Sequence, residues 1–185
     1  MSRNRLSSWV GYHSRVAAGL RLGRWLAGHI PFIGSALSIL VDKGLFFFYN
    51  IDGSSRRIDV SSLHVPHPGG ILLGGNGIVS DGRVLVNAGV KFVGPMPDDE
   101  PYLERHARGD VFNVGDNVVF GTNSVIIGPV TICDDVLIGA MSMVNKDIAE
   151  PGVYVGVPAR KIADEVRDVW FPAHYARPAR EGIQS

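Results

Sequence analysis

One histidine of the chain stands in a context suited to proton transfer. His67 is followed by Pro68, Gly69 and Gly70, and glycines allow a backbone to approach a ligand closely. A neutral imidazole can remove the proton of a hydroxyl group while the oxygen attacks a carbonyl carbon. The same residue could also be a packed, hydrogen-bonded histidine of the core. The residue and its neighbours alone leave both interpretations open.

Other sequence arrangements that carry chemistry are missing. The sequence contains no Walker phosphate loop, no nucleophile elbow around a serine and no helical zinc motif, and Gly75-Asn76-Gly77 lacks the third glycine of a dinucleotide fingerprint. His64 lies close to His67, but a catalytic zinc requires three protein ligands. We therefore expect no bound metal.

Charge and cysteine content limit the partners and the compartment. The 185 residues suit one substantial domain with a small appendage, and 18 Lys and Arg balance 18 Asp and Glu. No overall field therefore favours nucleic acid or an anionic membrane. The single cysteine, Cys133, rules out an internal disulfide and a cysteine-rich metal site, which fits a reducing compartment. We predict a cytoplasmic protein that does not bind nucleic acid.

Residues 1–50 differ from the rest of the chain, with six basic residues and a single acid. Ile30 to Tyr49 is apolar, but glycines and the pair Asp42-Lys43 interrupt it, which argues against a membrane span. A signal peptide is not expected, because the apolar run begins far from the amino end. We predict two helices, the second with Pro31 in its first turn, and no membrane association. Leu45 to Tyr49 should pack on the main domain or on a neighbouring subunit.

A repeat of six residues organises the second half of the chain. Neither a helix nor an ordinary hairpin has this period. Each hexad predicts one short strand and one turn, and Gly115, Gly121 and Gly139 suit corners where φ is positive. Three strands make one coil of a triangular prism, and stacked coils bury a core that no single repeat could bury. Two sets should face inward: Val114, Phe120, Ile126, Ile132, Ile138 and Val144, and Val118, Ser124, Val130, Val136, Ser142 and Ile148.

The repeat is less regular upstream. Leu73 and Val79 continue a six-residue spacing from His67, whereas Val86 and Phe92 belong to a set displaced by one residue. We place a bulge or corner insertion near Ser80 to Arg83 to account for the extra residue.

The predicted organisation has three parts. Residues 1–50 are a helical segment, and residues 51–163 are a β-helix, so the fold class is mainly β. Between Gly94 and Asp110 the hexads give way to a polar stretch, which predicts a protruding loop. Residues 164–185 form a short helix and a tail, with the helix expected over Ile162 to Trp170.

Two segments, with the hexads between them, resemble the hexapeptide-repeat acyltransferases and, among these, the serine O-acetyltransferases. They are His67-Pro68-Gly69-Gly70-Ile71-Leu72-Leu73-Gly74 and Gly156-Val157-Pro158-Ala159-Arg160-Lys161-Ile162, and the resemblance covers residues 50–163. It implies a left-handed parallel β-helix, an exception to the usual right-handed crossover. It also implies a homotrimer with active sites between adjacent prisms, and transfer of an acetyl group from acetyl-CoA to the hydroxyl of a small acceptor.

The resemblance assigns roles to individual residues. His67 matches the general base. Asp52 matches an aspartate that pairs with it, although Asp52 could also be an exposed aspartate of a turn. The pantetheine arm of CoA could lie along small corner residues, although turn geometry alone also explains them: Gly121, Thr122, Gly139 and Ala140. The oxyanion would meet a backbone amide at a glycine corner. Three cations could meet the CoA phosphates, or be solvated surface residues: Lys146, Arg160 and Lys161.

The chain departs from the serine enzymes at two positions. The acid that precedes their histidine is Pro66 here, and their second histidine aligns with Val111 or a neighbouring residue rather than with His106. The acceptor is therefore serine or a similar amino acid, or else a sugar or amine of a polysaccharide or secondary-metabolite pathway. A third alternative is a non-catalytic trimeric scaffold. His106 and Arg108 are the candidate acceptor-binding residues, because a solenoid places binding chemistry in such insertions. We expect the loop to reach the partner subunit's His67; the alternative is a solvated, mobile loop without a binding role.

Overall fold

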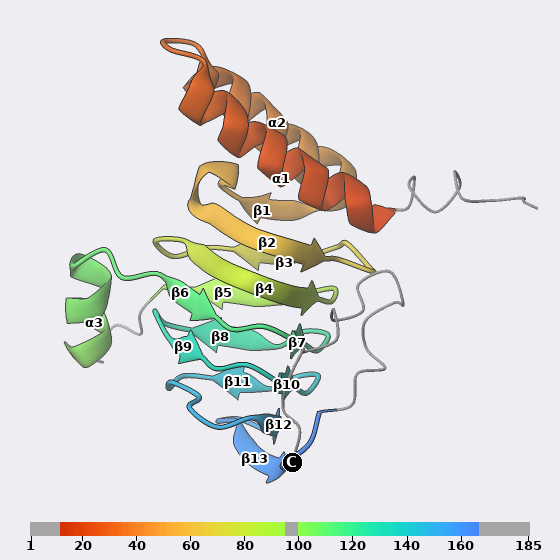
Figure 1. Cartoon of the computed structure of the whole chain (residues 1–185), viewed down its shortest axis with the longest axis vertical. Helices are drawn as coiled ribbons and strands as arrows, with labels where there is room; N and C mark the ends of the chain where they lie inside the picture. Colours follow the sequence, from red (N-terminus) through yellow and green to blue (C-terminus); the bar gives the residue numbers. More distant parts are fainter. Residues whose placement is uncertain (1–11, 95–99, 167–185) are drawn as a thin grey trace, which may run out of the picture.

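The computed structural model describes residues 12–94 and 100–166 of the chain (Figure 1). Two helices, α1 (Tyr12–His29) and α2 (Gly34–Tyr49), lie side by side across the amino-terminal end of a coil of strands. A side chain added at Gly19 would come within 2.9 Å of Leu45, so glycine lets the two helices approach closely. The two expected helices are confirmed. Pro31, however, lies in the turn before α2 and not in its first turn.

One face of the coil is a parallel sheet of short strands that are far apart in the sequence. Its order is β1 (Ile51–Gly53), β3 (Ile71–Leu73), β5 (Lys91–Val93), β8 (Val125–Ile127) and β11 (Met143–Val144). We call this the first face. Each strand belongs to a different turn of the coil.

The second and third faces share two long strands. β2 (Ile58–His64) and β4 (Ile78–Val86) begin on the second face and end on the third. β6 (Phe112–Val114) and β9 (Thr131–Ile132) continue the second face. The third face continues with β7 (Val118–Phe120), β10 (Val136–Ile138) and β12 (Gly152–Val155). The chain is a left-handed parallel β-helix, as predicted.

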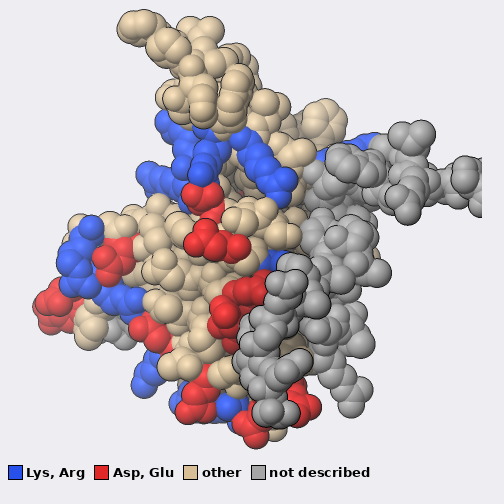
Figure 2. Space-filling model, in the orientation of Figure 1, with Lys and Arg blue, Asp and Glu red and all other residues tan. Residues whose placement is uncertain are grey.

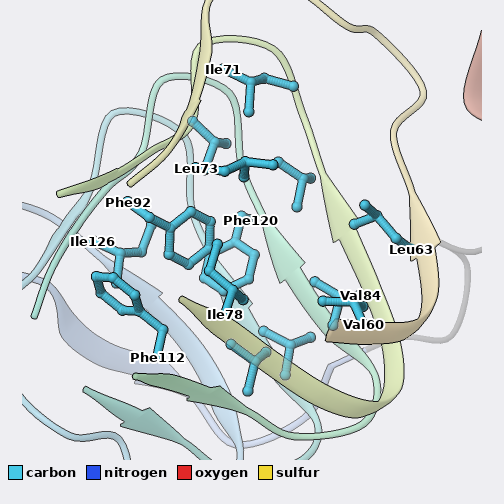
Figure 3. Packing of buried hydrophobic residues seen from close by; sticks show 14 of the residues in the cluster. Val60, Leu63, Ile71, Leu73, Ile78, Val84, Phe92, Phe112, Phe120 and Ile126 are labelled. Atoms are coloured by element: carbon cyan, nitrogen blue, oxygen red, sulfur yellow. The ribbon is translucent and has the colours of Figure 1, made fainter. Parts of the chain in front are cut away.

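The core fills the interior of the coil. Every member of the two predicted inward sets is buried, including Ser124 and Ser142, at 0% and 1% exposure. Three aromatic rings from successive strands meet edge to face, with centroids 5.2 Å apart for Phe92 and Phe112 and 5.0 Å apart for Phe92 and Phe120 (Figure 3). Such contacts add to the free energy gained by removing apolar surface from water.

The corner glycines are required for a different reason from the one predicted. Gly115, Gly121 and Gly139 are absent from the residues with positive φ, and the left-handed corner positions are Asn117, Asn123, Asp135 and Met141, with φ between 57° and 60°. A Cβ at Gly121 would lie 2.6 Å from the amide nitrogen of Ala140 and 2.7 Å from the carbonyl oxygen of Ile138. Glycine is needed there because the next coil stacks against its backbone.

In the upstream part of the coil, the predicted bulge is present, but one residue predicted to face inward faces outward. The register of β2 against β4 shifts between Val60 and Ser62, because Asp81 and Gly82 stand opposite Ser61 alone, so the predicted bulge near Ser80 to Arg83 is confirmed. Val79 was expected to face inward but is 36% exposed, whereas Ile78 is buried. The corner from Gly74 to Gly77 sets the phase of β4, and its length does not follow the six-residue period.

The ends of the domain also differ from expectation. The helix expected from Ile162 is wrong at its start, because β13 (Arg160–Ala163) pairs antiparallel with β12; residues 167–170 lie outside the described residues. Leu45 and Tyr49 pack on the core as predicted, but Phe46, Phe47 and Phe48 are exposed. None of the helices in the described residues has the length and apolar character needed to span a membrane.

Candidate active site

His67 lies on the prism edge where the chain passes from the third face to the first. The corners of successive coils stack along this edge, which we call the His67 edge: residues 65–70, 87–90, 121–124 and 139–142. Backbone hydrogen bonds join them, from Gly89 to Gly69 at 2.8 Å, from Asn123 to Ala88 at 2.9 Å and from Met141 to Thr122 at 2.9 Å. The edge is therefore a continuous backbone ladder that starts at the turn of His67.

The turn that carries His67 is open. His67 is exposed, so the alternative of a packed core histidine is wrong for this residue, whereas His64 at the end of β2 is buried. Gly70 has φ 63°, a conformation that favours glycine, and a Cβ at Gly69 would meet nothing within 4 Å. A ligand could therefore approach this backbone without a steric barrier.

The four predicted corner residues all lie on the His67 edge. Thr122 and Ala140 are exposed, and Gly121 and Gly139 are half-buried. The amide of Gly121 donates to the carbonyl of Ile138, and that of Gly139 to the carbonyl of Tyr154, both at 2.8 Å. These two amides hold the coils together, so the expectation that they stabilise an oxyanion is not supported.

Asp52 lies one coil before the strand that follows His67. It is exposed on the first face, where its Cα is in register with that of Leu72. Within residues 12–94 and 100–166, no hydrogen bond joins the Asp52 carboxylate to the His67 ring. The pairing that the resemblance implies stays a prediction.

Three predicted cations gather at the carboxyl-terminal end of the coil. Lys146, Arg160 and Lys161 line a cavity of about 220 Å³ with Tyr154 and Ala159. Lys161 Nζ lies 2.9 Å from Asp164 and 3.1 Å from Glu150, and these hydrogen bonds, that to Asp164 first, raise the pKa of Lys161 to about 12. Lys146 follows β11 and so belongs to the edge between the first and second faces. The three cations line one cavity, and none of them belongs to the corners that form the His67 edge.

The insertion between Gly94 and Asp110 carries α3 (Glu100–Ala107), which stands clear of the coil (Figure 1). It leaves the prism between the first and second faces, so it does not share an edge with His67. Asn76 Nδ2 donates to the carbonyls of His106 at 2.8 Å and Asp110 at 3.2 Å. Arg105 pairs with Asp147 at 3.1 Å. The insertion is thus anchored to the coil.

The two candidate acceptor residues have different surroundings. His106 is half-buried, and its Nδ1 is buried without a hydrogen-bond partner among the described residues. Arg108 is exposed and pairs with Asp110 at 3.0 Å. The anchoring role of Asn76 was not predicted, because in the sequence an asparagine between two glycines resembles only an incomplete nucleotide fingerprint. The described part of the chain contains no group of three potential metal ligands.

By its six-residue repeat and its three-sided coil, the chain has the left-handed parallel β-helix fold. The family model described as "Bacterial transferase hexapeptide (six repeats)" matches residues 113–146. Three solved structures, of two serine acetyltransferases, share the fold. The enzyme of Brucella abortus strain S19 in complex with coenzyme A has a TM-score of 0.70 and 21% identity, over 89% of this chain and 62% of that one.

Two structures of the serine acetyltransferase of Neisseria gonorrhoeae give similar values. One has a TM-score of 0.67 and 21% identity, over 84% of this chain and 56% of that one. The other, in complex with serine, has a TM-score of 0.66 and 20% identity, over 88% and 62%. This chain therefore spans 56% to 62% of the length of these similar proteins.

Proposed function

We propose that the chain is an acetyl-CoA-dependent O-acetyltransferase similar to the serine O-acetyltransferases. The observation that carries the proposal is the shared edge, on which the exposed His67 stands in line with stacked small corners such as Thr122 and Ala140. Strands of adjacent coils are ~4.8 Å apart, so the corner of Gly139, three coils away, is about 14 Å from that of His67. A pantetheine arm laid along this edge would hold its thioester near the imidazole.

His67 is the proposed general base. Its imidazole takes the proton of the acceptor hydroxyl as the oxygen attacks the thioester carbonyl carbon. The C–S bond then breaks, and the CoA thiolate leaves and takes the proton from the imidazolium. Asp52 is the proposed positioning residue for the ring. Because the amides of Gly121 and Gly139 already bond to the next coil, the oxyanion donor must be another group.

The phosphates of CoA would meet the cations at the carboxyl-terminal end of the coil. Lys146 and Arg160 are exposed and line the cavity there, and cations bind phosphate oxygens by charge-assisted hydrogen bonds. Lys161 contributes less, because Glu150 and Asp164 already hold its ammonium group.

The complete site requires a second chain, and we propose a homotrimer. His106 and Arg108 leave the prism at a different edge from His67, so they can approach a base only in an adjacent prism. Light scattering should give a mass three times that of the 20.0 kDa chain. A monomeric mass would remove the shared-site proposal. A cytoplasmic location completes the proposal, consistent with the single cysteine.

The acceptor is an amino acid such as L-serine, or a sugar or amine. By the resemblance, Pro66 stands where the serine enzymes have an acid, and Val111 or a neighbouring residue stands where they have a second histidine. These departures favour testing the wider class of acceptors. The experiment is release of CoA thiol from acetyl-CoA with L-serine, L-threonine, a hexose and an aminohexose. Acceptor-dependent release with any of these supports the transferase. Release with none of them, from a folded trimer, would favour the non-catalytic scaffold.

A further inference from the structure

The hairpin of α1 and α2 has an apolar outer surface that the fold leaves uncovered. Of fourteen exposed large hydrophobic side chains in the described residues, nine lie on this hairpin. Phe32 at its tip is fully exposed, and Phe47 and Phe48 are 81% and 76% exposed. Large exposed apolar surfaces mark sites of contact with a partner or a membrane. We call this set the apolar cap: Leu22, Trp25, Phe32, Ile33, Ile39, Leu40, Phe46, Phe47 and Phe48.

The cap follows from the orientation of α2. Ser38 and Leu45 face inward and are buried. Ala36, Leu40 and Phe47 are exposed at spacings that repeat on one side of a helix. Lys43 is the charged residue on this side. Because these apolar residues of α2 point away from the domain, the outer surface of the helix is suited to contact with another apolar surface.

Basic residues lie beneath the cap. Figure 2 shows lysines and arginines gathered under the hairpin, over the first coil, and an uncharged upper part of the hairpin. Residues 12–57 hold six Lys and Arg but only Asp42 and Asp52 as acids. The Asp42 carboxylate faces the coil, where it accepts a 3.0 Å hydrogen bond from the amide of Ser55. We call the exposed cations at this level the basic belt: Arg21, Arg24, Arg56 and Arg57.

The structure holds part of this belt in place. Arg21 Nη2 donates to the carbonyl of Ser61 at 2.9 Å, and Arg24 pairs with Asp59. Both arginines line a groove of about 460 Å³ between α1 and β2, together with Trp25 and His29. The Trp25 and His29 rings stack with centroids 5.3 Å apart. Tryptophan is favoured at the boundary between acyl chains and water, and guanidinium groups bind phosphate oxygens.

We propose that this hairpin docks the protein on the surface of a bilayer that contains anionic lipids. The apolar cap enters the boundary between headgroups and acyl chains, and the basic belt meets the lipid phosphates. The hairpin lies on the surface, because Ser38 and Leu45 keep α2 packed on the domain. No membrane association was expected from the sequence, because the net charge is zero and polar residues interrupt the apolar run from Ile30 to Tyr49. The proposal goes beyond the proposed transferase and does not depend on it.

A lipid surface suits the apolar cap better than a second copy of the chain does. A symmetric contact through the cap would bring two identical surfaces together. The basic belts beneath both caps would then approach one another, and like charges oppose such a contact. Anionic headgroups instead neutralise the belt while the acyl region covers the phenylalanines.

The test is co-sedimentation of the full chain with vesicles of phosphatidylcholine, with and without a minor fraction of phosphatidylglycerol. We expect binding to the mixed vesicles, weaker by roughly tenfold or more without the anionic lipid, and reduced by salt. Phe47→Ser combined with Phe48→Ser should lower partitioning by roughly a hundredfold. The matched control is Ile162→Ser, which removes a 64% exposed side chain at the other end of the coil and should leave binding unchanged.

A charge variant separates the two parts of the surface. Arg56→Glu with Arg57→Glu changes two exposed residues of the basic belt, keeps every apolar side chain of the cap, and should weaken binding to the mixed vesicles alone. The proposal is overturned if the mixed vesicles leave the wild-type chain in solution at low salt, or if the double phenylalanine variant binds like the wild type. If that variant binds vesicles normally but light scattering shows a smaller oligomer than the wild type forms, the cap is an interface between copies of the chain and the proposal is overturned.

Discussion

The amide of Gly89 donates a 2.8 Å hydrogen bond to the carbonyl of Gly69, so the turn that carries His67 is stacked on the corner of the next coil. The position of the exposed imidazole is therefore set by main chain and not by packing around its own ring. The same edge continues through Asn123 and Met141. A rigid scaffold of this kind can hold a functional group without using its side chain for stability.

Replacing His67 with alanine should lower turnover by roughly 10² to 10⁴-fold, the usual contribution of a general base. Acetyl-CoA affinity and melting temperature should change little, because the side chain is exposed. Steady-state thiol release and calorimetric CoA binding measure the two effects. Turnover within a few fold of the wild type, in a folded protein, would leave His67 without a catalytic role.

Replacing Gly121 with alanine should destabilise the coil by about 1–3 kcal/mol, because overpacking forces a backbone shift. The added methyl group would lie 2.6 Å from the amide nitrogen of Ala140. Gly44→Ala is the control, since a Cβ there meets nothing within 4 Å, and it should stabilise α2 by up to about 1 kcal/mol. Denaturant unfolding monitored by circular dichroism compares them. If Gly121→Ala had the same free energy of unfolding as the wild type, the two coils could move apart at this corner without loss of stability.

Replacing Asn76 with alanine should release the insertion that carries α3. Its side-chain amide bonds to the carbonyls of His106 and Asp110, and losing both bonds should cost about 1–2 kcal/mol. Hydrogen exchange at the amides of Gly109 and Asp110, which are bonded within the insertion, should accelerate. Arg108→Ala, which removes an exposed ion pair, should change exchange much less. Unaltered exchange in the Asn76 variant would mean that other contacts anchor α3.

The thiol of Cys133 should react slowly in the folded protein. Burial is the main cause that raises its pKa above the ordinary value of 9.0, and the thiolate is the reactive species. A disulfide reagent near pH 8 should therefore modify the native chain more slowly than the urea-unfolded chain. Because the folded thiol keeps its proton to higher pH, its contribution to stability is present below the unfolded pKa and falls as the pH rises above it. Equal rates in both states would contradict this assignment.

The inward residues of the coil could be predicted because the signal is local. Each hexad contains its own strand and turn, and side chains alternate between the two sides of a strand. Val118 and Ser124 share a position in the repeat, and both are buried, although serine alone would not predict a core residue. The burial of Ser124 could be predicted from its position in the six-residue repeat, although not from its residue type.

The corner glycines show where local reasoning fails. Gly121 and Gly139 are eighteen residues apart in the sequence, and a Cβ at Gly121 would lie 2.7 Å from the carbonyl carbon of Gly139. This requirement depends on the neighbouring coil, so no window around Gly121 contains it. Asn123 instead takes the left-handed conformation, which asparagine tolerates better than most residues.

The sequence by itself determined the repeat, the inward sets, the bulge near Ser80 and His67 as the candidate base, since each depends on residues close together in the chain. Only the tertiary structure decided which corners share an edge. It aligned His67 with Thr122 and Ala140, put Lys146 on another edge, and turned Phe47 and Phe48 outward. The reason is geometric. The number of residues in each complete coil fixes which corners stack, and one extra residue or one insertion changes that number without disturbing the hexads around it.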